Sequence, residues 1–81
     1  MTIQVRLFAR ARDLAGAGAV SVELPAPATV AELRDRLGEV CPALRPLLPR
    51  SAVAVDEEFA KDDSVIPAGA EVALLPPVSG G

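Results

Sequence analysis

The chain has 81 residues, a net charge of −3, a single cysteine and no histidine. This length supports one domain around one hydrophobic core. Nucleic acid is not an expected partner, because the chain is acidic and its aromatic residues are two phenylalanines, whereas nucleic-acid binding needs basic or stacking side chains. The lack of histidine excludes an imidazole base and a Ser-His-Asp triad. We therefore expect no catalytic machinery of the chain's own, and no bound metal or cofactor.

The apolar runs of the sequence fall short of the about 20 residues that span a bilayer. The first ten residues alternate between apolar and polar types, unlike a signal peptide. A cytoplasmic protein without a membrane partner is expected. The single thiol, Cys41, lies at the end of an apolar helical stripe, which favours a buried structural role over a nucleophilic one.

Two strands are predicted at the start of the chain. Residues 2–10 (TIQVRLFAR) alternate strictly, with Ile3, Val5 and Leu7 on one face, and residues 20–24 (VSVEL) alternate in the same way. Between them, ARDLAGAGA predicts a turn or a short helical fragment. A connection this short favours antiparallel pairing of the two strands.

The clearest helix signal lies in residues 25–42. Thr29 and Glu32 form a T-x-x-E capping box, and Pro42 is expected to end the helix. Gly38 is expected to weaken its last turns by about 1 kcal/mol relative to alanine. The predicted apolar stripe consists of Val30, Leu33, Leu37, Val40 and Cys41.

The second half of the chain predicts three more strands, at residues 52–55, 59–61 and 71–76. The proline-containing stretch 43–51 predicts a packed connector, and the stretch 62–70 predicts a turn or short 3₁₀ segment. The apolar side chains expected to point inward from these two stretches are Leu44, Leu47, Leu48, Val65 and Ile66.

The predicted order is strand, strand, helix, strand, short strand, strand. Placing the last strand beside the first and parallel to it, with the helix across one face, satisfies the connection rules. This is an α+β β-grasp, or ubiquitin-like, fold with a mixed sheet of about five strands. We expect residues 1–76 to form the domain and residues 77–81 a flexible tail. The predicted core consists of Ile3, Val5, Leu7, Val22, Leu33, Leu37, Val53, Val55, Val72 and Leu74.

The last residues of the sequence are typical of an extended segment that enters another protein's active site. Pro76 and Pro77 remove two backbone donors and favour a stiff, extended exit from the sheet. Val78 and Ser79 offer a partner a small apolar contact and a hydroxyl. From Pro77 onward, five residues reach roughly 16–18 Å, a length suited to entering another protein's active site.

Gly80 and Gly81 close the sequence and have no Cβ, so their backbone fits a channel too narrow for other residues. A free carboxylate is a poor electrophile, but a mixed anhydride with AMP removes both its charge and its poor leaving group. The adenylate can then accept sulfur or be captured by an amine, and neither step needs a catalytic side chain on the carrier. The alternative is an inert, frayed end, since glycines are common there.

The chain resembles the small, sulfur-carrying subunit of molybdopterin synthase. The matching stretches are VRLFARARDLAG, ATVAELRDRL, AVAVDEE and GAEVALLPPVSGG, which follow one another in family order along nearly the whole chain. PPVSGG is the most specific of them. Two turns depart from the family pattern: DEE stands where relatives often have Asn-Gly, and PAGAEV where many have Asp-Gly-Asp-Glu-Val.

The resemblance implies a sulfur-carrier function centred on Gly81. An E1-like activating enzyme would use ATP to adenylate Gly81, and a sulfur donor system would convert it to a thiocarboxylate. Two carriers would dock on a dimeric large subunit in a 2+2 heterotetramer. Each tail would deliver sulfur to a cyclic pyranopterin monophosphate, and successive transfers would make the dithiolene of molybdopterin.

A docking patch is predicted near the exit of the tail. If the first and last strands are parallel neighbours, Phe8 and Leu75 share the face opposite the helix. An exposed aromatic beside an exposed leucine is a candidate partner-binding surface, although Phe8 has the alternative role of covering the sheet edge. Arg6, Arg10 and Arg12 either flank this patch or are ordinary solvated charges.

Three other functions stay open at this point. One is a related β-grasp sulfur carrier for thiamin synthesis or tRNA thiolation. Another is a ubiquitin-like modifier conjugated to lysines through Gly81, for which Lys61 is the chain's only lysine. The last is an interaction domain with an inert tail.

Overall fold

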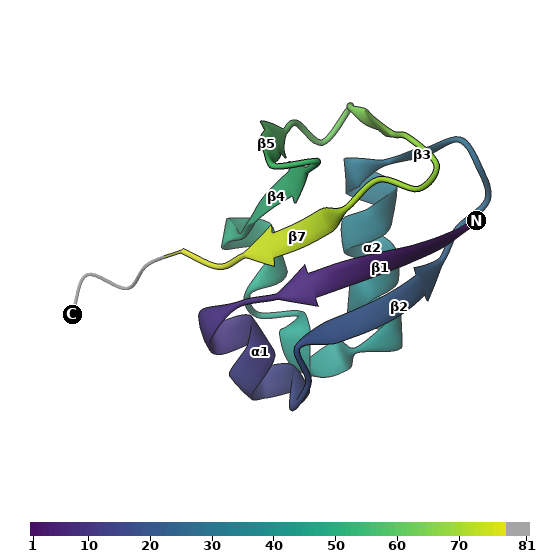
Figure 1. Cartoon of the computed structure of the whole chain (residues 1–81). Coiled ribbons are helices and arrows are strands. Elements are labelled where there is room, and N and C mark those ends of the chain that lie inside the picture. The colour runs from purple at the N-terminus through teal and green to yellow at the C-terminus, as the bar shows by residue number, and fades with distance from the viewer. Residues whose placement is uncertain (78–81) are drawn as a thin grey trace.

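The computed structural model describes residues 1–77. Its centre is a five-stranded mixed sheet of order β2-β1-β7-β4-β5 (Figure 1). The strands are β1 (Thr2–Leu7), β2 (Ala19–Glu23), β4 (Ala52–Val55), β5 (Glu58–Ala60) and β7 (Val72–Leu75). The β-grasp prediction is confirmed, because β1 pairs antiparallel with β2 and parallel with β7.

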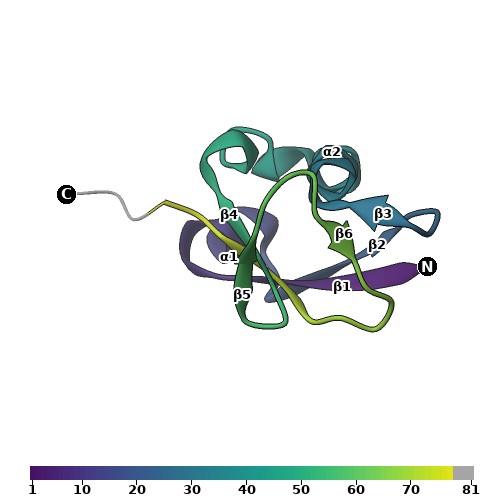
Figure 2. The ribbon, with the colours of Figure 1, turned by 90° about the horizontal axis from the view of Figure 1, so that it is seen from above.

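The helical elements lie on one face of the sheet. Figure 2 shows α2 (Val30–Val40) and the connector that follows it as a layer separate from the strands. The predicted capping box is present, since the Thr29 hydroxyl accepts from the Glu32 amide and the Glu32 carboxylate accepts from the Thr29 amide. α2 ends at Val40, with Cys41 as its C-cap and Pro42 directly after. The signals at both ends of the helix were therefore interpreted correctly.

The core lies between α2 and the sheet. All the predicted core residues are buried except Val55, which is half-buried because it is the last residue of β4 before a turn. The core also includes Val30, Leu44, Leu48 and Ile66, which were predicted to point inward from the helix and the two connecting stretches. Ala11, Leu24 and Ala28 are further core residues that the sequence did not predict.

A second helix, α1 (Ala9–Ala15), follows β1 directly, where the sequence predicted only a turn or helical fragment. The first strand consequently ends at Leu7 rather than at residue 10. Gly16 ends α1 in the left-handed region, with φ of 70°, and its amide donates to the carbonyl of Arg12. Glycine reaches that conformation without a Cβ penalty, which explains the stop at this position.

The stretch predicted as a turn also contains β6 (Val65–Ile66), which pairs with β3 (Ala28–Thr29) in a small second sheet. Ile66 is buried as predicted, but Val65 is 58% exposed. The inward prediction for Val65 was wrong because neighbouring residues of a strand point to opposite faces.

The apolar stripe of α2 is shorter than predicted. Val40 is 44% exposed and Cys41 is half-buried rather than buried. In the last turns the helix is covered on the side of Gly38, where a Cβ would lie only 3.3 Å from Cδ1 of Leu48. Gly38 therefore permits close packing, a gain that the predicted cost of a helical glycine did not include.

The connector after α2 forms two 3₁₀ turns, η1 (Pro42–Leu44) and η2 (Leu48–Arg50). Leu44 and Leu48 are buried and Leu47 is half-buried, so the predicted anchoring is largely confirmed. The Ser51 hydroxyl, also buried, donates to the carbonyl of Leu47 at 2.8 Å.

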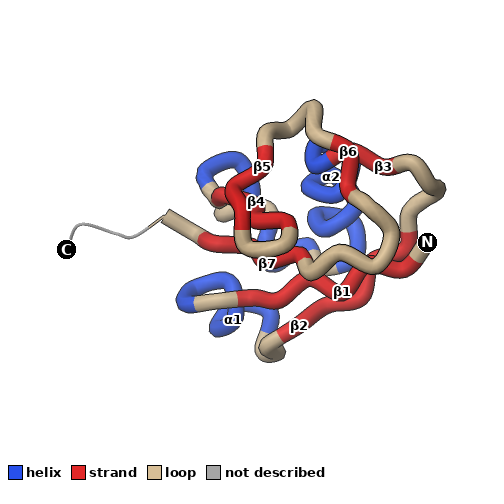
Figure 3. Tube along the Cα trace, turned by 45° about the horizontal axis from the view of Figure 1, so that its top comes forward, coloured by secondary structure: helices blue, strands red, loops and turns tan. Residues whose placement is uncertain are grey.

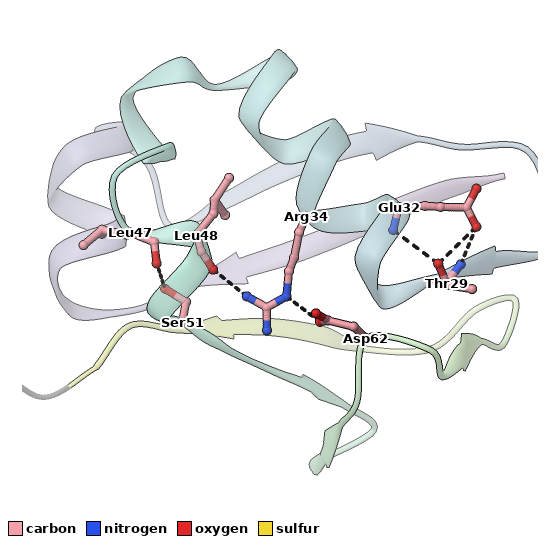
Figure 4. Close-up of polar contacts among 7 residues, drawn as sticks. All are labelled: Thr29, Glu32, Arg34, Leu47, Leu48, Ser51 and Asp62. Carbon is pink, nitrogen blue, oxygen red and sulfur yellow. Dashed lines mark hydrogen bonds and ion pairs between the residues drawn. The ribbon is translucent and has the colours of Figure 1, made fainter.

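Arg34 ties the connector to α2. Figure 4 shows its guanidinium between the carbonyl of Leu48 and the carboxylate of Asp62, with Nε 2.8 Å from Oδ1 of Asp62. The Arg34 side chain is only 19% exposed. One side chain therefore joins three segments that are distant in sequence.

No helix within residues 1–77 is long and apolar enough to cross a membrane.

Candidate functional site

The face of the sheet opposite α2 is the candidate site. Figure 3 shows β7 between β1 and β4, with the β4–β5 hairpin at one edge. Strand register assigns residues to this open face: Arg6 lies opposite Ala73, Ala73 opposite Ala54, and Ala54 opposite Phe59. Side chains from four segments of the chain are thereby brought to one surface.

These residues form a groove of about 240 Å³. Ala54 and Ala73 have small side chains, whereas Phe8, Phe59 and Leu75 contribute larger apolar ones. Phe59 is 78% exposed and Phe8 37% exposed, while Leu75 is half-buried. Exposed aromatic surface beside a shallow apolar groove is typical of a protein-binding site.

Charged side chains line the same groove. The guanidinium carbon of Arg6 lies 5.3 Å from the centroid of the Phe8 ring, within the range of a cation–π contact. The carboxylates of Glu57 and Glu71 are also among its lining residues. The groove thus combines an apolar centre with charges of both signs, which suits a partner with an apolar anchor and a polar rim.

The position of Phe8 is fixed by the junction of β1 and α1. Phe8 is the N-cap residue of α1, with extended backbone, and its carbonyl accepts from the amide of Ala11 at 3.1 Å. Ala9 then has a φ of 50°, a value that costs energy for a residue with a Cβ. The chain therefore turns sharply directly after Phe8.

The position of Phe59 is fixed by the two-residue turn between β4 and β5. Asp56 and Glu57 both have positive φ, 50° and 69°, as in the hairpin turns that favour Asn-Gly. The Asp56 amide donates to the carbonyl of Glu71, and the Asp56 carboxylate accepts from the Glu71 amide. These two bonds hold the hairpin against the start of β7, in the register that places Phe59 beside Ala54.

The exit of the tail lies at the end of β7. This strand ends at Leu75, and it is followed by a half-buried Pro76 and an exposed Pro77 without regular structure. Val78, Ser79, Gly80 and Gly81 lie outside the described residues. Their roles in binding and chemistry therefore stay predictions, as does the domain boundary at residue 76.

The structure brings together only part of the predicted patch. Phe8, Leu75 and Arg6 line one groove, whereas Arg10 lines a different one and Arg12 lines neither. Phe59, which sequence reasoning did not assign to the patch, is more exposed than Phe8. The sequence predicted a three-residue turn, DEE, before a strand at residues 59–61, whereas the observed turn is Asp56-Glu57 and the strand begins at Glu58, which places residue 59 opposite residue 54.

Residues 1–77 contain no group of three or more Cys, Asp or Glu side chains arranged to hold a metal ion. The chain's one thiol, on Cys41, lies at the end of α2 and is not among the residues of the open-face groove.

The fold and the site define a class: a ubiquitin-like β-grasp protein with an apolar groove on its open face and a C-terminal strand that leads into a Gly-Gly sequence. The chain belongs to the ThiS family, whose model matches residues 5–81.

Curated relatives extend over almost the whole chain. It is 34% identical to the molybdopterin synthase sulfur carrier subunit of Arabidopsis thaliana, over 98% of this chain and 82% of the relative. It is 32% identical to the protein of the same name from Chlamydomonas reinhardtii, with both chains fully covered.

Solved structures agree with the fold. The crystal structure of SAMP1 from Haloferax volcanii matches with a TM-score of 0.87 and 32% identity, over the full length of both chains. A chain of the complex of subunits 1 and 2 of the molybdopterin-converting factor from Helicobacter pylori matches with a TM-score of 0.71 and 26% identity, again over both full lengths.

Proposed function

We propose that this chain is the sulfur-carrier subunit of a molybdopterin synthase. The observation that carries the proposal is the match, over almost the whole chain, to relatives of that name, on a chain whose last strand leads into Pro-Pro-Val-Ser-Gly-Gly. The groove on the open face supplies a surface for partners next to that strand. The chain contributes a binding domain and one reactive group, the carboxylate of Gly81.

The chemistry begins with activation of Gly81 by an E1-like enzyme. Its carboxylate attacks the α-phosphorus of ATP, giving an acyl-adenylate and releasing pyrophosphate. A sulfur donor system then supplies the nucleophile that displaces AMP, which leaves a thiocarboxylate. Both steps use the enzymes' catalytic groups, which is consistent with a carrier that has no histidine.

Sulfur transfer takes place on the large subunit. The thiocarboxylate sulfur bonds to a carbon of the cyclic pyranopterin monophosphate as an oxygen substituent leaves that carbon. Water then hydrolyses the resulting thioester, which leaves the sulfur on the pterin and returns Gly81 to a carboxylate. A dithiolene needs two sulfur atoms and therefore two loaded carriers. We propose a 2+2 heterotetramer; the Helicobacter pylori neighbour, solved as a complex of subunits 1 and 2, supports a large-subunit partner.

Docking on the large subunit is assigned to the open-face groove. Phe8, Phe59 and Leu75 supply the apolar anchor, and Arg6, Glu57 and Glu71 supply polar contacts around it. Because Leu75 belongs both to the groove and to the last strand, binding at the groove orients Pro76 and Pro77 and directs the tail into the partner.

The test is intact-mass spectrometry of the purified chain after incubation with activating enzyme, ATP and a sulfur source. We expect a mass increase equal to the replacement of one oxygen by sulfur, located by fragmentation at Gly81. An unmodified mass, with activating enzyme shown to be active on another carrier, would contradict the proposal.

A second candidate function is conjugation to proteins through Gly81. It is favoured by the match to SAMP1, a protein described as a small archaeal modifier protein in a related structure. The two functions differ in the acceptor of the activated carboxyl group. Isopeptide-linked Gly81 on lysines of other proteins would support conjugation, whereas a thiocarboxylate consumed by the pterin supports the carrier.

A further inference from the structure

A second groove lies beside the exit of the tail and plays no part in the function proposed above. It has a volume of about 570 Å³, within the about 300–1,000 Å³ typical of sites that bind small ligands. Its apolar lining comes from Leu14 of α1 and from Ala43, Pro46 and Leu47 of the connector. α1 contacts both η1 and β7, so the groove lies where the connector, α1 and the end of the last strand meet.

The charge of this groove is unusual for an acidic chain. Its charged lining residues are Arg10 and Arg50, and no carboxylate from residues 1–77 lines it. Four other grooves on residues 1–77 each include at least one carboxylate. The ion pairs of the described chain join Arg34 to Asp62 and Arg36 to Glu39, so within residues 1–77 neither Arg10 nor Arg50 has an acidic partner.

The last described residue of the chain, Pro77, is itself part of the groove lining. Figure 1 shows the yellow end of the chain leaving the sheet next to α1. Four residues follow Pro77, and they extend at most roughly 13–14 Å. They comprise one apolar side chain, one hydroxyl and two glycines. Together with the Gly81 carboxylate of the proposed function, they match an apolar groove with two guanidinium groups.

We propose that this groove is a binding site for the chain's own C-terminal segment, residues 78–81. In the bound state Val78 lies against the apolar lining, and the carboxylate of Gly81 pairs with Arg10 and Arg50. The groove then holds the tail of the free carrier on the domain, and a partner that uses Gly81 first draws the tail out. The inference concerns the resting place of the tail and does not depend on which group Gly81 delivers.

Docking of this kind is weak and reversible. A carboxylate paired with exposed guanidinium groups gains little in water and loses that gain as salt screens the charges. Two glycines also lose much backbone freedom on binding. Weak docking suits a carrier, because the activating enzyme binds only molecules whose tail is free. The apparent affinity for that enzyme therefore falls only in proportion to the fraction of molecules with a docked tail.

The test compares amide spectra of the ¹⁵N-labelled full chain with those of a variant that ends at Pro77. Removal of the tail is expected to shift the amides of Leu14, Ala43 and Leu47, and about 0.5 M salt is expected to abolish most of the difference. Unchanged groove amides, or differences confined to Pro76 and its strand neighbours, would overturn the proposal.

Matched variants identify the carboxylate contact. In the Arg10→Gln/Arg50→Gln double variant, removal of the tail is expected to leave the groove amides unshifted. In the control Arg12→Gln/Arg36→Gln, which loses the same charge outside the groove, the wild-type shifts are expected to persist. If the tail-dependent shifts are lost equally in both double variants, the effect depends on net charge rather than on Arg10 and Arg50, and the assignment of the site is overturned.

Two further results count against the proposal. Groove shifts that grow with protein concentration would assign the surface to a second copy of the chain. Groove shifts that persist in high salt would contradict the proposed pairing of the Gly81 carboxylate with Arg10 and Arg50. The salt series uses the wild-type chain, so it holds even if a double variant does not fold. None of these measurements needs the activating enzyme, so their outcome is independent of thiocarboxylate formation at Gly81.

Discussion

The two faces of the sheet differ in what covers them. On one face Val5, Val72 and Leu74 are fully buried beneath α2. On the other, Phe59 is 78% exposed. Figure 2 shows α2 and the connector that follows it on one side of the strands. β7 contributes to both faces in alternation before it leads into the tail. The covered face stabilises the fold, and the open face is available to partners. Substitutions on the covered face should therefore lower stability, whereas substitutions on the open face should weaken partner binding.

The largest functional effect is expected from deleting Gly81. The deletion removes the reacting carboxylate from its place at the end of the tail, so sulfur loading and transfer should be lost. The melting temperature should not change, because the deleted residue follows the folded domain. Calorimetry beside the loading assay checks both; a markedly lower melting temperature would mean that the tail supports the fold.

The largest effect on stability is expected from Leu37→Ala on α2. Leu37 is fully buried between helix and sheet, so the substitution removes buried apolar surface and leaves a cavity, at a cost of about 2–5 kcal/mol. Val40→Ala, on the same helix but 44% exposed, is the matched control and should cost under about 1 kcal/mol. Urea unfolding measures both; equal losses would contradict the location of the core.

The open face is tested by Phe8→Ala and Phe59→Ala. Each should weaken binding to the large subunit about tenfold or more, as expected for an aromatic anchor, with stability changed by under about 1 kcal/mol. The control is Val65→Ala, an exposed apolar residue outside the groove, which should leave affinity unchanged. Titration calorimetry that gives wild-type affinity for both phenylalanine variants would remove the docking role of this face.

A smaller loss of stability is expected from Arg34→Gln. The substitution removes hydrogen bonds from the guanidinium to the Leu48 carbonyl and the Asp62 carboxylate, for about 1–2 kcal/mol. In Arg36→Gln, the pair with Glu39 is lost on an exposed surface, and the expected change is under about 0.5 kcal/mol. The difference between the two variants in urea unfolding separates a contact that joins segments from a surface ion pair.

The smallest effect is a gain in stability from Glu57→Gly. Glu57 has a φ of 69° in the β4–β5 turn, and glycine relieves that strain, for about 0.5–1 kcal/mol. Glu58→Gly, one residue later in β5, should instead destabilise, because glycine weakens a strand. If both variants lose stability, the turn is not strained at residue 57.

The fold was predictable because its local signals agree with one another. Strict alternation in β1, the capping box at Thr29 and Glu32, and Pro42 after α2 each specified an element that the structure contains. The parallel pairing of β1 with β7 followed from the connection rules rather than from any residue. The errors at Val40 and Gly38 concern burial that tertiary packing determines. The sequence does not reveal which side of the last turn of α2 the connector covers.

The candidate site was predictable in part. Phe8 and Leu75 were found from alternation alone, since the pairing of β1 and β7 places both on the open face. Phe59 was missed because its position depends on the register of the β4–β5 hairpin. The turn of that hairpin, Asp56-Glu57, lacks the glycine that is typical of two-residue turns, so its length was not predicted. The sequence also grouped Arg10 with Arg6; the intervening turn at Ala9 instead carries Arg10 onto α1 and to the second groove.

The most direct measurement of the central claim is a single-turnover reaction. Chain carrying a thiocarboxylate at Gly81 is mixed with molybdopterin synthase large subunit and cyclic pyranopterin monophosphate, and both the mass of the chain and the dithiolene product are followed. The account predicts that Gly81 returns to a carboxylate as product appears, with two carriers consumed per dithiolene. A thiocarboxylate that persists beside unreacted pterin, under conditions in which another carrier reacts, would contradict it.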